Sequence, residues 1–127
     1  MDRIEENLFI GSIKEKGSWE EFDSVINLSR ENIESTSKTE VYNIPVDTGN
    51  PGKKSLEKAV NKALEVLEKD KKLLICCRQG VSRSVGVTSK VLSEKTDKSF
   101  RESIHYIEKI RPVSNPSMKI LKTLEDI

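Results

Sequence analysis

The sequence predicts an α/β fold in which a central, mostly parallel sheet of about four to five strands is flanked by helices. Two observations favour this fold. Short apolar runs alternate along the chain with longer segments whose apolar residues recur at helical spacing. The most apolar run, residues 72–76, is bounded on both sides like a buried strand, and a short loop and a helical pattern follow it. We therefore expect this strand near the middle of the sheet.

The first half of the chain is predicted to hold three short strands, over residues 8–10, 25–28 and 41–46. Gly11 and Ser12 indicate a turn after the first strand, and Ser18 is a suitable cap for a short helix over 19–22. Residues 30–40 are polar and lack periodicity, so they are expected to form a surface loop. Pro45 indicates that the third strand lies near an edge of the sheet or ends there. Turn-forming residues predict a further loop over 47–52.

The second half of the chain is mostly helical. Ser55 is a suitable N-cap for a helix that extends to about Asp70. A second helix is predicted over 84–94, directly after the candidate central strand and its loop. Two more helices are marked by apolar stripes, the first formed by Phe100, Ile104 and Ile107 and ending before Pro112, the second formed by Met118, Leu121 and Leu124.

The composition restricts the function classes. A length of 127 residues suits one domain with its own core, and we expect residues 1–127 to form that domain. With 22 basic and 21 acidic residues and 5% aromatic residues, the chain is a poor candidate for binding nucleic acid or membranes. No signal peptide and no apolar run of about 20 residues is readable. The two cysteines are adjacent and make a poor structural disulfide, which indicates a reducing, cytoplasmic setting.

Cys77 and Arg83 define the candidate site. Cys77 follows the apolar run, a short loop containing Gly80 comes next, and Arg83 and Ser84 open the following helix. A helix N-terminus presents free backbone N–H groups and a partial positive charge, which bind phosphate and favour a thiolate over a thiol. The pattern is typical of a site that attacks a phosphate ester with sulfur.

Each residue of this loop can be given a role in such a reaction. Cys77 would be the nucleophile, and Gly80 would supply the turn that aims backbone N–H groups at the phosphate. Arg83 would hold two phosphate oxygens, most strongly in the transition state. Ser84 would hydrogen-bond the sulfur and help it to leave in the second step. The substrate phosphate would be bound by Arg78, Gln79, Gly80, Val81, Ser82 and Arg83.

A carboxyl group on a separate loop is needed to protonate the leaving oxygen. Asp47 fits this role, because it follows a predicted strand, lies in a loop rich in Gly and Pro, and precedes Cys77 by thirty positions. Its strand is expected to run beside the Cys77 strand, with the helix over 55–70 crossing between them as in a βαβ unit. Glu40 is a poor substitute because it precedes the strand.

The segment from Cys77 to Ser84 resembles the active loop of the Cys-dependent protein tyrosine phosphatases, specifically the small dual-specificity type. That loop reads His-Cys, five residues, Arg, then Ser or Thr. Residues 8–12 and 25–29 look like the family's first two strands, and Asp47 falls where the family keeps its general acid. The family's C-terminal Arg-Pro…Pro segment is matched by Arg111, Pro112 and Pro116.

Two positions depart from the family pattern. Cys76 replaces the histidine that helps to organise the loop and stabilise the thiolate, and Ser117 replaces the usual Asn. The resemblance implies a protein phosphatase that forms a cysteinyl-phosphate intermediate and needs no metal or other cofactor. Its substrates would be phosphorylated proteins carrying phosphotyrosine, with phosphoserine and phosphothreonine as further candidates. The sequence does not determine an oligomeric state.

Simpler interpretations compete with these roles. Cys77 could be a buried structural cysteine, Asp47 only a turn residue, and Ser84 only an N-cap, although their joint spacing favours the catalytic reading. For Cys76 we favour a small buried side chain over a redox partner, because adjacent cysteines form strained bridges. The pair Lys53–Lys54 and His105 are interpreted as surface residues.

Two other functions remain open. A weakened site could capture phosphoproteins without turnover, as a pseudophosphatase, although Cys77, Arg83 and Asp47 are all retained. Other thiol chemistry is less consistent with the order of the residues. Arsenate-reductase and low-molecular-weight phosphatase designs place the Cys loop near the N-terminus, and a rhodanese-like sulfur carrier would not require Arg83 or Asp47. A phosphoinositide substrate ranks low, because Arg78 is the only extra base within the loop.

Overall fold

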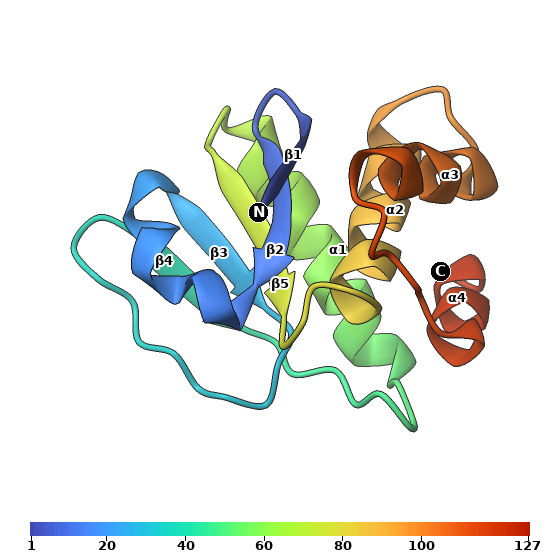
Figure 1. The fold of residues 1–127 in the computed structure, drawn as a ribbon, viewed down its shortest axis with the longest axis horizontal. Helices are drawn as coiled ribbons and strands as arrows, with labels where there is room; N and C mark the ends of the chain where they lie inside the picture. Colours follow the sequence, from blue (N-terminus) through green and yellow to red (C-terminus); the bar gives the residue numbers. More distant parts are fainter.

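Five strands form one sheet in the order β1-β2-β5-β3-β4 (Figure 1). The computed structural model describes residues 1–127. Only β1 and β2 are antiparallel, and every other neighbouring pair is parallel. The predicted α/β class with a mostly parallel sheet is therefore confirmed. The strands are β1 (Asp2–Glu5), β2 (Leu8–Ser12), β3 (Ser24–Asn27), β4 (Glu40–Asn43) and β5 (Leu73–Cys77).

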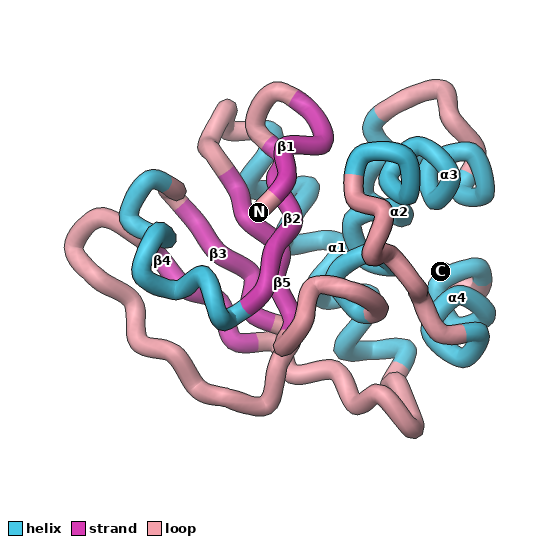
Figure 2. The backbone as a smooth tube through the Cα atoms, in the orientation of Figure 1, coloured by secondary structure: helices cyan, strands magenta, loops and turns pink.

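The two faces of the sheet are covered unequally (Figure 2). Four α-helices and the main hydrophobic core lie on one face, and a 3-10 helix with a small second core lies on the other. The helices are α1 (Lys53–Glu68), α2 (Arg83–Lys95), α3 (Phe100–Ile110), α4 (Met118–Glu125) and the 3-10 helix η1 (Ile13–Glu21). No helix combines the length and the apolarity needed to cross a membrane.

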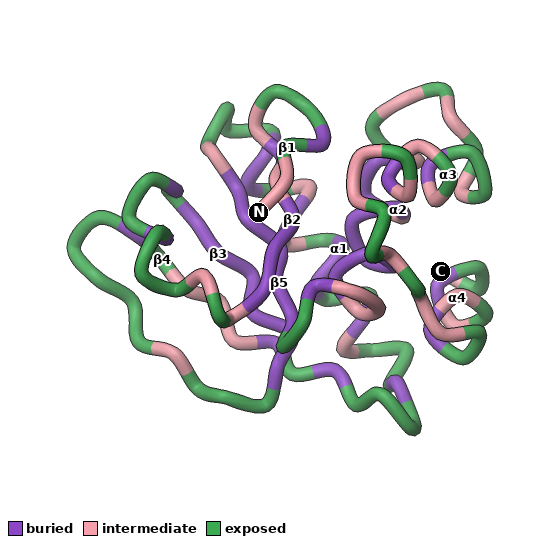
Figure 3. The backbone as a smooth tube through the Cα atoms, viewed as in Figure 1, coloured by how far each residue is buried: buried purple, intermediate pink, exposed green.

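β5 is the central strand, and all five of its residues are buried (Figure 3). Because side chains alternate along a strand, the two cysteines face opposite ways. Cys77 contributes to the main core on the helical side, whereas Cys76 packs with Trp19 and Phe22 under η1. The parallel arrangement also places the C-terminal ends of β3, β4 and β5 at one edge, where the loops that follow them leave the sheet (Figure 1).

The prediction that the strand before Asp47 lies beside the Cys77 strand is wrong. β3 lies between them, and Val25 of β3 pairs with Val41 of β4 on one side and with Leu74 of β5 on the other. All four residues of β3 are buried, whereas β4 is only partly buried, so the more apolar strand takes the inner position. α1 does link β4 to β5, but the crossover passes over one intervening strand. The edge position that Pro45 indicated for the third strand is confirmed.

Several element boundaries differ from the predictions for local reasons. Gly11 and Ser12 do not form a turn, because they belong to β2 and pair with Cys76 and Cys77. η1 accordingly starts at Ile13 behind Ser12, and Ser18 does not cap it. β1 was not predicted, since Ile4 is its only buried residue.

The helical half shows smaller differences. α1 begins directly after Gly52, which places Ser55 inside its first turn instead of at the N-cap. α2 begins at Arg83, with Ser82 as its N-cap residue. In α4 the buried residues are Ile120 and Leu124, and Met118 is 66% exposed, so the predicted apolar stripe is only partly correct.

Candidate active site

The loop between β5 and α2 surrounds a hollow of about 350 Å³ at the C-terminal edge of the sheet. The sequence-predicted loop residues are brought together here, and Thr48 joins them from the loop after β4. Gly80 and Ser84 are buried behind the lining. The hollow is lined by Thr48, Cys77, Arg78, Gln79, Val81, Ser82 and Arg83.

The Cys77 thiol lies in an environment that favours its ionised form. Burial alone would raise its pKa, but hydrogen bonds and charge outweigh burial and hold the pKa below the ordinary value of a thiol. The Ser84 Oγ lies 3.2 Å from the Cys77 Sγ, and the Gly80 backbone N–H donates to the same sulfur at 3.2 Å. The Ser84 backbone N–H and the Arg83 guanidinium act in the same direction. The site can therefore present a thiolate.

Arg83 is anchored to the neighbouring strands. Its Nη1 donates to the carbonyl of Leu28 at 3.2 Å and to the carbonyl of Val46 at 3.1 Å, just beyond the ends of β3 and β4. These bonds fix the guanidinium above the edge of the sheet, and its other nitrogens make no hydrogen bond within the protein. An arginine held in this way can offer a planar pair of donors to an oxyanion.

Gly80 requires a backbone that other residues rarely adopt. Its φ is +69°, and a Cβ atom at this position would lie 2.5 Å from the Arg111 Nη2 and 2.7 Å from the Gly11 carbonyl oxygen. Both the left-handed turn and the close approach of two other segments therefore exclude a side chain. The turn directs the Gly80 N–H at the sulfur of Cys77.

The segment after α3 braces the loop from outside. The Arg111 Nε donates to the Gly80 carbonyl at 2.8 Å, and its Nη1 donates to the Asp2 Oδ2 at 2.7 Å. Further along, the Ser117 backbone N–H donates to the Ser82 Oγ at 2.9 Å. Because that hydroxyl is turned toward Ser117, it does not cap α2. The first N–H groups of α2 are thus left without a side-chain cap beside the hollow.

Asp47 lies near the hollow but does not line it. Its Oδ1 accepts hydrogen bonds from the Gly49 and Asn50 backbone N–H groups at 2.8 and 3.2 Å, and its Oδ2 accepts from the Arg30 Nη2 at 3.0 Å. The Gly49 and Asn50 bonds, followed by the Arg30 charge, hold the pKa of this carboxyl below its ordinary value. The structure therefore holds Asp47 as a carboxylate that is turned toward its own loop and Arg30.

The structure also gives the positions of Cys76, His105 and Ser84, which the sequence analysis had considered. Cys76 is fully buried, and burial raises the pKa of its thiol, so it is a core side chain where the family has histidine. His105 is exposed and pairs with Glu108 at 3.3 Å on the surface of α3. Ser84 is the second residue of α2 and not its N-cap, and its hydroxyl points at the Cys77 sulfur.

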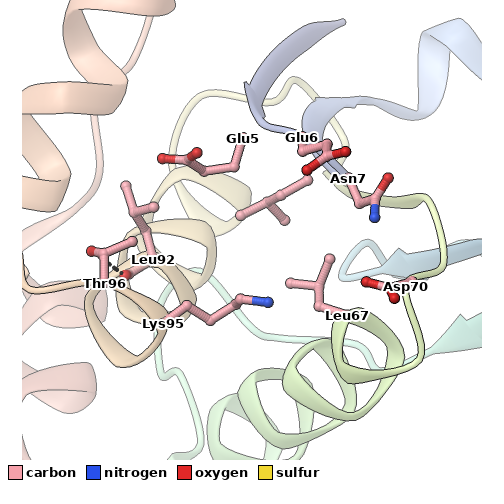
Figure 4. A pocket seen from close by; sticks show the side chains of 9 residues that line it. Glu5, Glu6, Asn7, Leu67, Asp70, Leu92, Lys95 and Thr96 are labelled. Carbon is pink, nitrogen blue, oxygen red and sulfur yellow. Dashed lines mark hydrogen bonds between the residues drawn. The ribbon is translucent and has the colours of Figure 1, made fainter.

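Among the further hollows of the chain, one adjoins the loop and another lies far from it. The one beside the loop, of about 120 Å³, is lined by Arg30, Glu31 and five other residues. The other, of about 220 Å³, lies at the opposite edge of the sheet, between the β1–β2 turn and the C-terminal ends of α1 and α2 (Figure 4). Asp70 and Lys95 line it together with other residues, but Cys77 and the phosphate loop do not contribute to it.

Sequence reasoning missed two contributors to this edge of the sheet. Asp2 lies more than one hundred positions from Arg111, and only the antiparallel pairing of β1 brings the two together. Arg30 belongs to a segment that was interpreted only as a surface loop. The parallel order β5-β3 could have drawn attention to it, because residues that follow β3 must emerge beside the loop that follows β5.

Comparison with known proteins agrees with this geometry. The model of the "Dual specificity phosphatase, catalytic domain" family matches residues 8–127. The chain is 27% identical over 124 residues to "Putative tyrosine phosphatase 123R" of Invertebrate iridescent virus 6, covering 96% of this chain and 87% of that protein.

Two solved structures share the fold. Human DUSP28 superposes with a TM-score of 0.84 at 20% identity, covering 99% of this chain and 94% of the other. DUSP15 superposes with a TM-score of 0.89 at 20% identity, covering 99% and 85%. Since the family model spans nearly the whole chain, from β2 to the last residue, this chain belongs to the dual-specificity phosphatase family, the small type of Cys-based protein tyrosine phosphatase, and is a phosphoric monoester hydrolase.

Proposed function

We propose that this phosphatase hydrolyses phosphotyrosine in proteins through a cysteinyl-phosphate formed on Cys77, with phosphoserine and phosphothreonine as further substrates. The observation that carries the proposal is the position of the Cys77 sulfur, 3.2 Å from both the Ser84 hydroxyl and the Gly80 N–H, at the uncapped start of α2. A thiolate in such a place is a competent nucleophile toward phosphorus.

The reaction would proceed in two steps. In the first, the Cys77 thiolate attacks phosphorus, an S–P bond forms, the bond from phosphorus to the leaving oxygen breaks, and Asp47 gives that oxygen its proton. In the second, water attacks phosphorus, the S–P bond breaks, and the Asp47 carboxylate takes the proton of the water. The Ser84 hydroxyl would stabilise the sulfur as it leaves.

The phosphate would be held by the loop. The backbone N–H groups of Arg78, Gln79, Val81 and Ser82 donate no hydrogen bond within the protein, which leaves them available for phosphate oxygens. Arg83 would add two donors from the nitrogens that do not bind Leu28 or Val46. Since this positive charge is fixed in advance, it would stabilise the charge that spreads in the transition state.

Asp47 would need to move before it acts as the acid. In the structure its carboxylate is bound by Gly49, Asn50 and Arg30, which favours the deprotonated form. The ion pair between Asp47 and Arg30 is exposed. Exposed pairs contribute little stability, so breaking this one costs little free energy. We infer that the loop of residues 47–52 carries Asp47 toward the leaving oxygen when substrate occupies the hollow.

Capture without turnover is not favoured as the function. This alternative was suggested by Cys76, which stands where the family has histidine. Even with Cys76 at that position, the loop residues contact the Cys77 sulfur and the pKa of Cys77 is lowered. We further propose that residues 1–127 act as one catalytic domain in a reducing, cytoplasmic setting, which is consistent with two free cysteines.

The test is hydrolysis of p-nitrophenyl phosphate and of a phosphotyrosine peptide by the wild type, Cys77→Ser and Cys76→Ala, together with rapid acid quenching and mass analysis. Wild type and Cys76→Ala should yield a phosphorylated enzyme with the modification on Cys77. Cys77→Ser should lose turnover by at least about 10⁴-fold and yet bind the peptide. Retained turnover in Cys77→Ser would remove Cys77 as the nucleophile.

A further inference from the structure

The start of α4 is fixed to the phosphate loop. The Asn115 backbone N–H donates to the Val81 carbonyl at 2.8 Å, and the Ser117 backbone N–H donates to the Ser82 Oγ at 2.9 Å. The Ser117 hydroxyl in turn caps the helix by accepting from the Ile120 backbone N–H at 3.2 Å. A side chain from the first turn of α4 therefore starts from a position that is set relative to the nucleophile.

Lys119 lies in this first turn and reaches the loop that carries Asp47. Its Nζ donates to the Gly49 carbonyl at 3.0 Å, although the two residues are 70 positions apart in the sequence. The Gly49 backbone N–H donates to the Asp47 Oδ1 at 2.8 Å. One glycine thus joins the lysine to the carboxylate. Both bonds belong to the arrangement in which Asp47 stays outside the lining of the hollow, which we call the retracted arrangement.

The loop of residues 47–52 has few other contacts that could hold it. Only two hydrogen bonds connect it to segments other than α1. One runs from Arg30 to the Asp47 Oδ2 and restrains the carboxylate. The other runs from Lys119 to Gly49 and restrains the backbone. The Gly49 carbonyl accepts no backbone N–H, so Lys119 is its single partner within the protein.

We propose that Lys119 is a positioning residue that retains the loop of residues 47–52 in the retracted arrangement and thereby sets how readily Asp47 reaches the leaving oxygen. The inference rests on the proposed function, because it assumes that Asp47 is the general acid. A lysine ammonium donates a charge-assisted hydrogen bond to the carbonyl, which favours the arrangement that contains it. Because Lys119 is exposed, the bond is weak enough to break in each turnover.

The proposal predicts that removing this bond shifts the loop toward the position in which Asp47 can act. The gain is confined to reactions that need the acid. In the first step, a basic leaving oxygen needs a proton from Asp47, whereas a weakly basic one does not. The effect of Lys119 should therefore depend on the leaving group.

The experiment measures kcat/KM of Lys119→Met for phenyl phosphate and for p-nitrophenyl phosphate, two small esters that differ chiefly in the basicity of the leaving oxygen. Methionine keeps an apolar stem and removes the donor. The readout is the ratio of kcat/KM for phenyl phosphate to that for p-nitrophenyl phosphate, which cancels any change in phosphate binding that both esters share. We expect this ratio to rise by about two- to fivefold over the wild type, as the loss of an exposed hydrogen bond predicts.

Three matched variants identify the cause. Lys119→Arg keeps a donor and should keep the wild-type ratio. Lys122→Met makes the same charge change on the same helix, and since Lys122 is exposed and forms no hydrogen bond through its side chain, the ratio should also stay at the wild-type value. In an Asp47→Asn background, Lys119→Met should no longer change the ratio, because its effect passes through Asp47.

Two results would overturn the role of Lys119. One is a ratio that Lys119→Met leaves unchanged or lowers. The other is an equal rise in Lys122→Met, which would assign the effect to charge alone. The proposed function fails separately, through turnover retained in Cys77→Ser or through a ratio that Asp47→Asn leaves unchanged. A ratio that falls in Asp47→Asn but does not rise in Lys119→Met would reject the role of Lys119 alone.

Discussion

At the scale of single residues, the candidate site depends on how one sulfur is surrounded. Cys76 and Cys77 are adjacent and both buried, yet the pKa of one thiol is raised and that of the other is lowered. Burial raises the pKa of both, so the difference comes from the donors. Cys77 has the Ser84 hydroxyl and the Gly80 N–H within 3.2 Å, whereas Cys76 faces aromatic side chains. Orientation on the strand decides which cysteine can be reactive.

Ser84→Ala should raise the pKa of Cys77, because it removes the strongest group that opposes burial. Catalysis needs the thiolate, so the acidic limb of kcat/KM should move to higher pH, and the rate of iodoacetamide alkylation should follow the same shift. The second step should slow as well, which would produce a burst of product with an activated ester. Ser93→Ala is the control, since its hydroxyl bonds only to the Lys90 carbonyl. Unchanged pH profiles in Ser84→Ala would contradict its role.

At the scale of elements, three loops that follow parallel strands build the site. The end of β5 carries Cys77 and the loop after it surrounds the hollow, the loop after β4 carries Asp47 and Thr48, and the segment after β3 carries Arg30. Arg83 connects all three, because its Nη1 bonds reach Leu28 and Val46 beyond the ends of β3 and β4. The Arg111–Asp2 pair ties the β5 loop to the opposite edge strand. The loops are therefore held by side chains as well as by the sheet.

Gly80→Ala should disable the loop more than it destabilises the fold. The added Cβ would meet Arg111 and the Gly11 carbonyl at 2.5 and 2.7 Å, and φ of +69° disfavours alanine. We expect kcat/KM to fall by at least about 10²-fold, while the free energy of unfolding decreases by roughly 1–3 kcal/mol. Gly17→Ala is the control, because a Cβ there meets nothing within 4 Å. Wild-type turnover in Gly80→Ala would show that the turn is not required.

Asp47→Asn should slow substrates according to their leaving groups. Phosphotyrosine and alkyl phosphates need a proton on the leaving oxygen, so their hydrolysis should fall by about 10²-fold or more, whereas an activated ester with a low-pKa leaving group should be affected much less. Since the acid must be protonated, rate is lost as pH rises through its pKa. This alkaline limb should flatten in Asp47→Asn. An equal effect on poor and good leaving groups would show that another residue is the acid. Glu31→Gln is the comparison variant, because Glu31 is another carboxylate near the loop.

At the scale of the whole molecule, one edge of one sheet collects the groups to which the proposed reaction assigns a role. The four α-helices cover one face of the sheet, and the family model matches residues 8–127, which include all of these groups but not Asp2. The positive charge at the site comes from arginines and from the start of α2. This charge is supplied by the protein, so the reaction as proposed has no step left for a metal ion.

Activity should accordingly survive EDTA, and vanadate, which mimics five-coordinate phosphorus, should inhibit competitively with substrate. The measurement is hydrolysis of p-nitrophenyl phosphate by protein treated with chelator, with and without added Mg²⁺ or Zn²⁺. Arg83→Lys, which loses the planar fork, should weaken vanadate binding as well as turnover. A rate that vanishes in EDTA and returns with a divalent ion would reject the metal-free mechanism.

Local sequence alone predicted the candidate site, because its main residues are close together along the chain. The spacing from Cys77 to Ser84, the preceding apolar run and the following helix are contiguous, so chain connectivity alone brings them together. The four α-helices were similarly predictable, since apolar periodicity reports the buried face directly, although the start of α1 and the apolar stripe of α4 were only partly correct. The 3-10 helix η1 was predicted too short and with the wrong cap. Asp47 was predicted as the acid from its loop composition and its position after a strand, but the strand β3 that separates it from Cys77 was not predicted there.

Tertiary structure decided the features that depend on the order of strands. The order of the strands depends on which of them buries the most apolar surface at the centre of the sheet. Short segments such as β3 and β4 do not show this in their own sequence. The insertion of β3 between β4 and β5 separates Asp47 from Cys77 by a strand and at the same time places Arg30 beside the phosphate loop. Asp2 reaches Arg111 only through β1, a strand with one buried residue. The sequence by itself therefore determined the phosphatase family of this protein, and only the packing of the sheet decided which charged residues surround the candidate site.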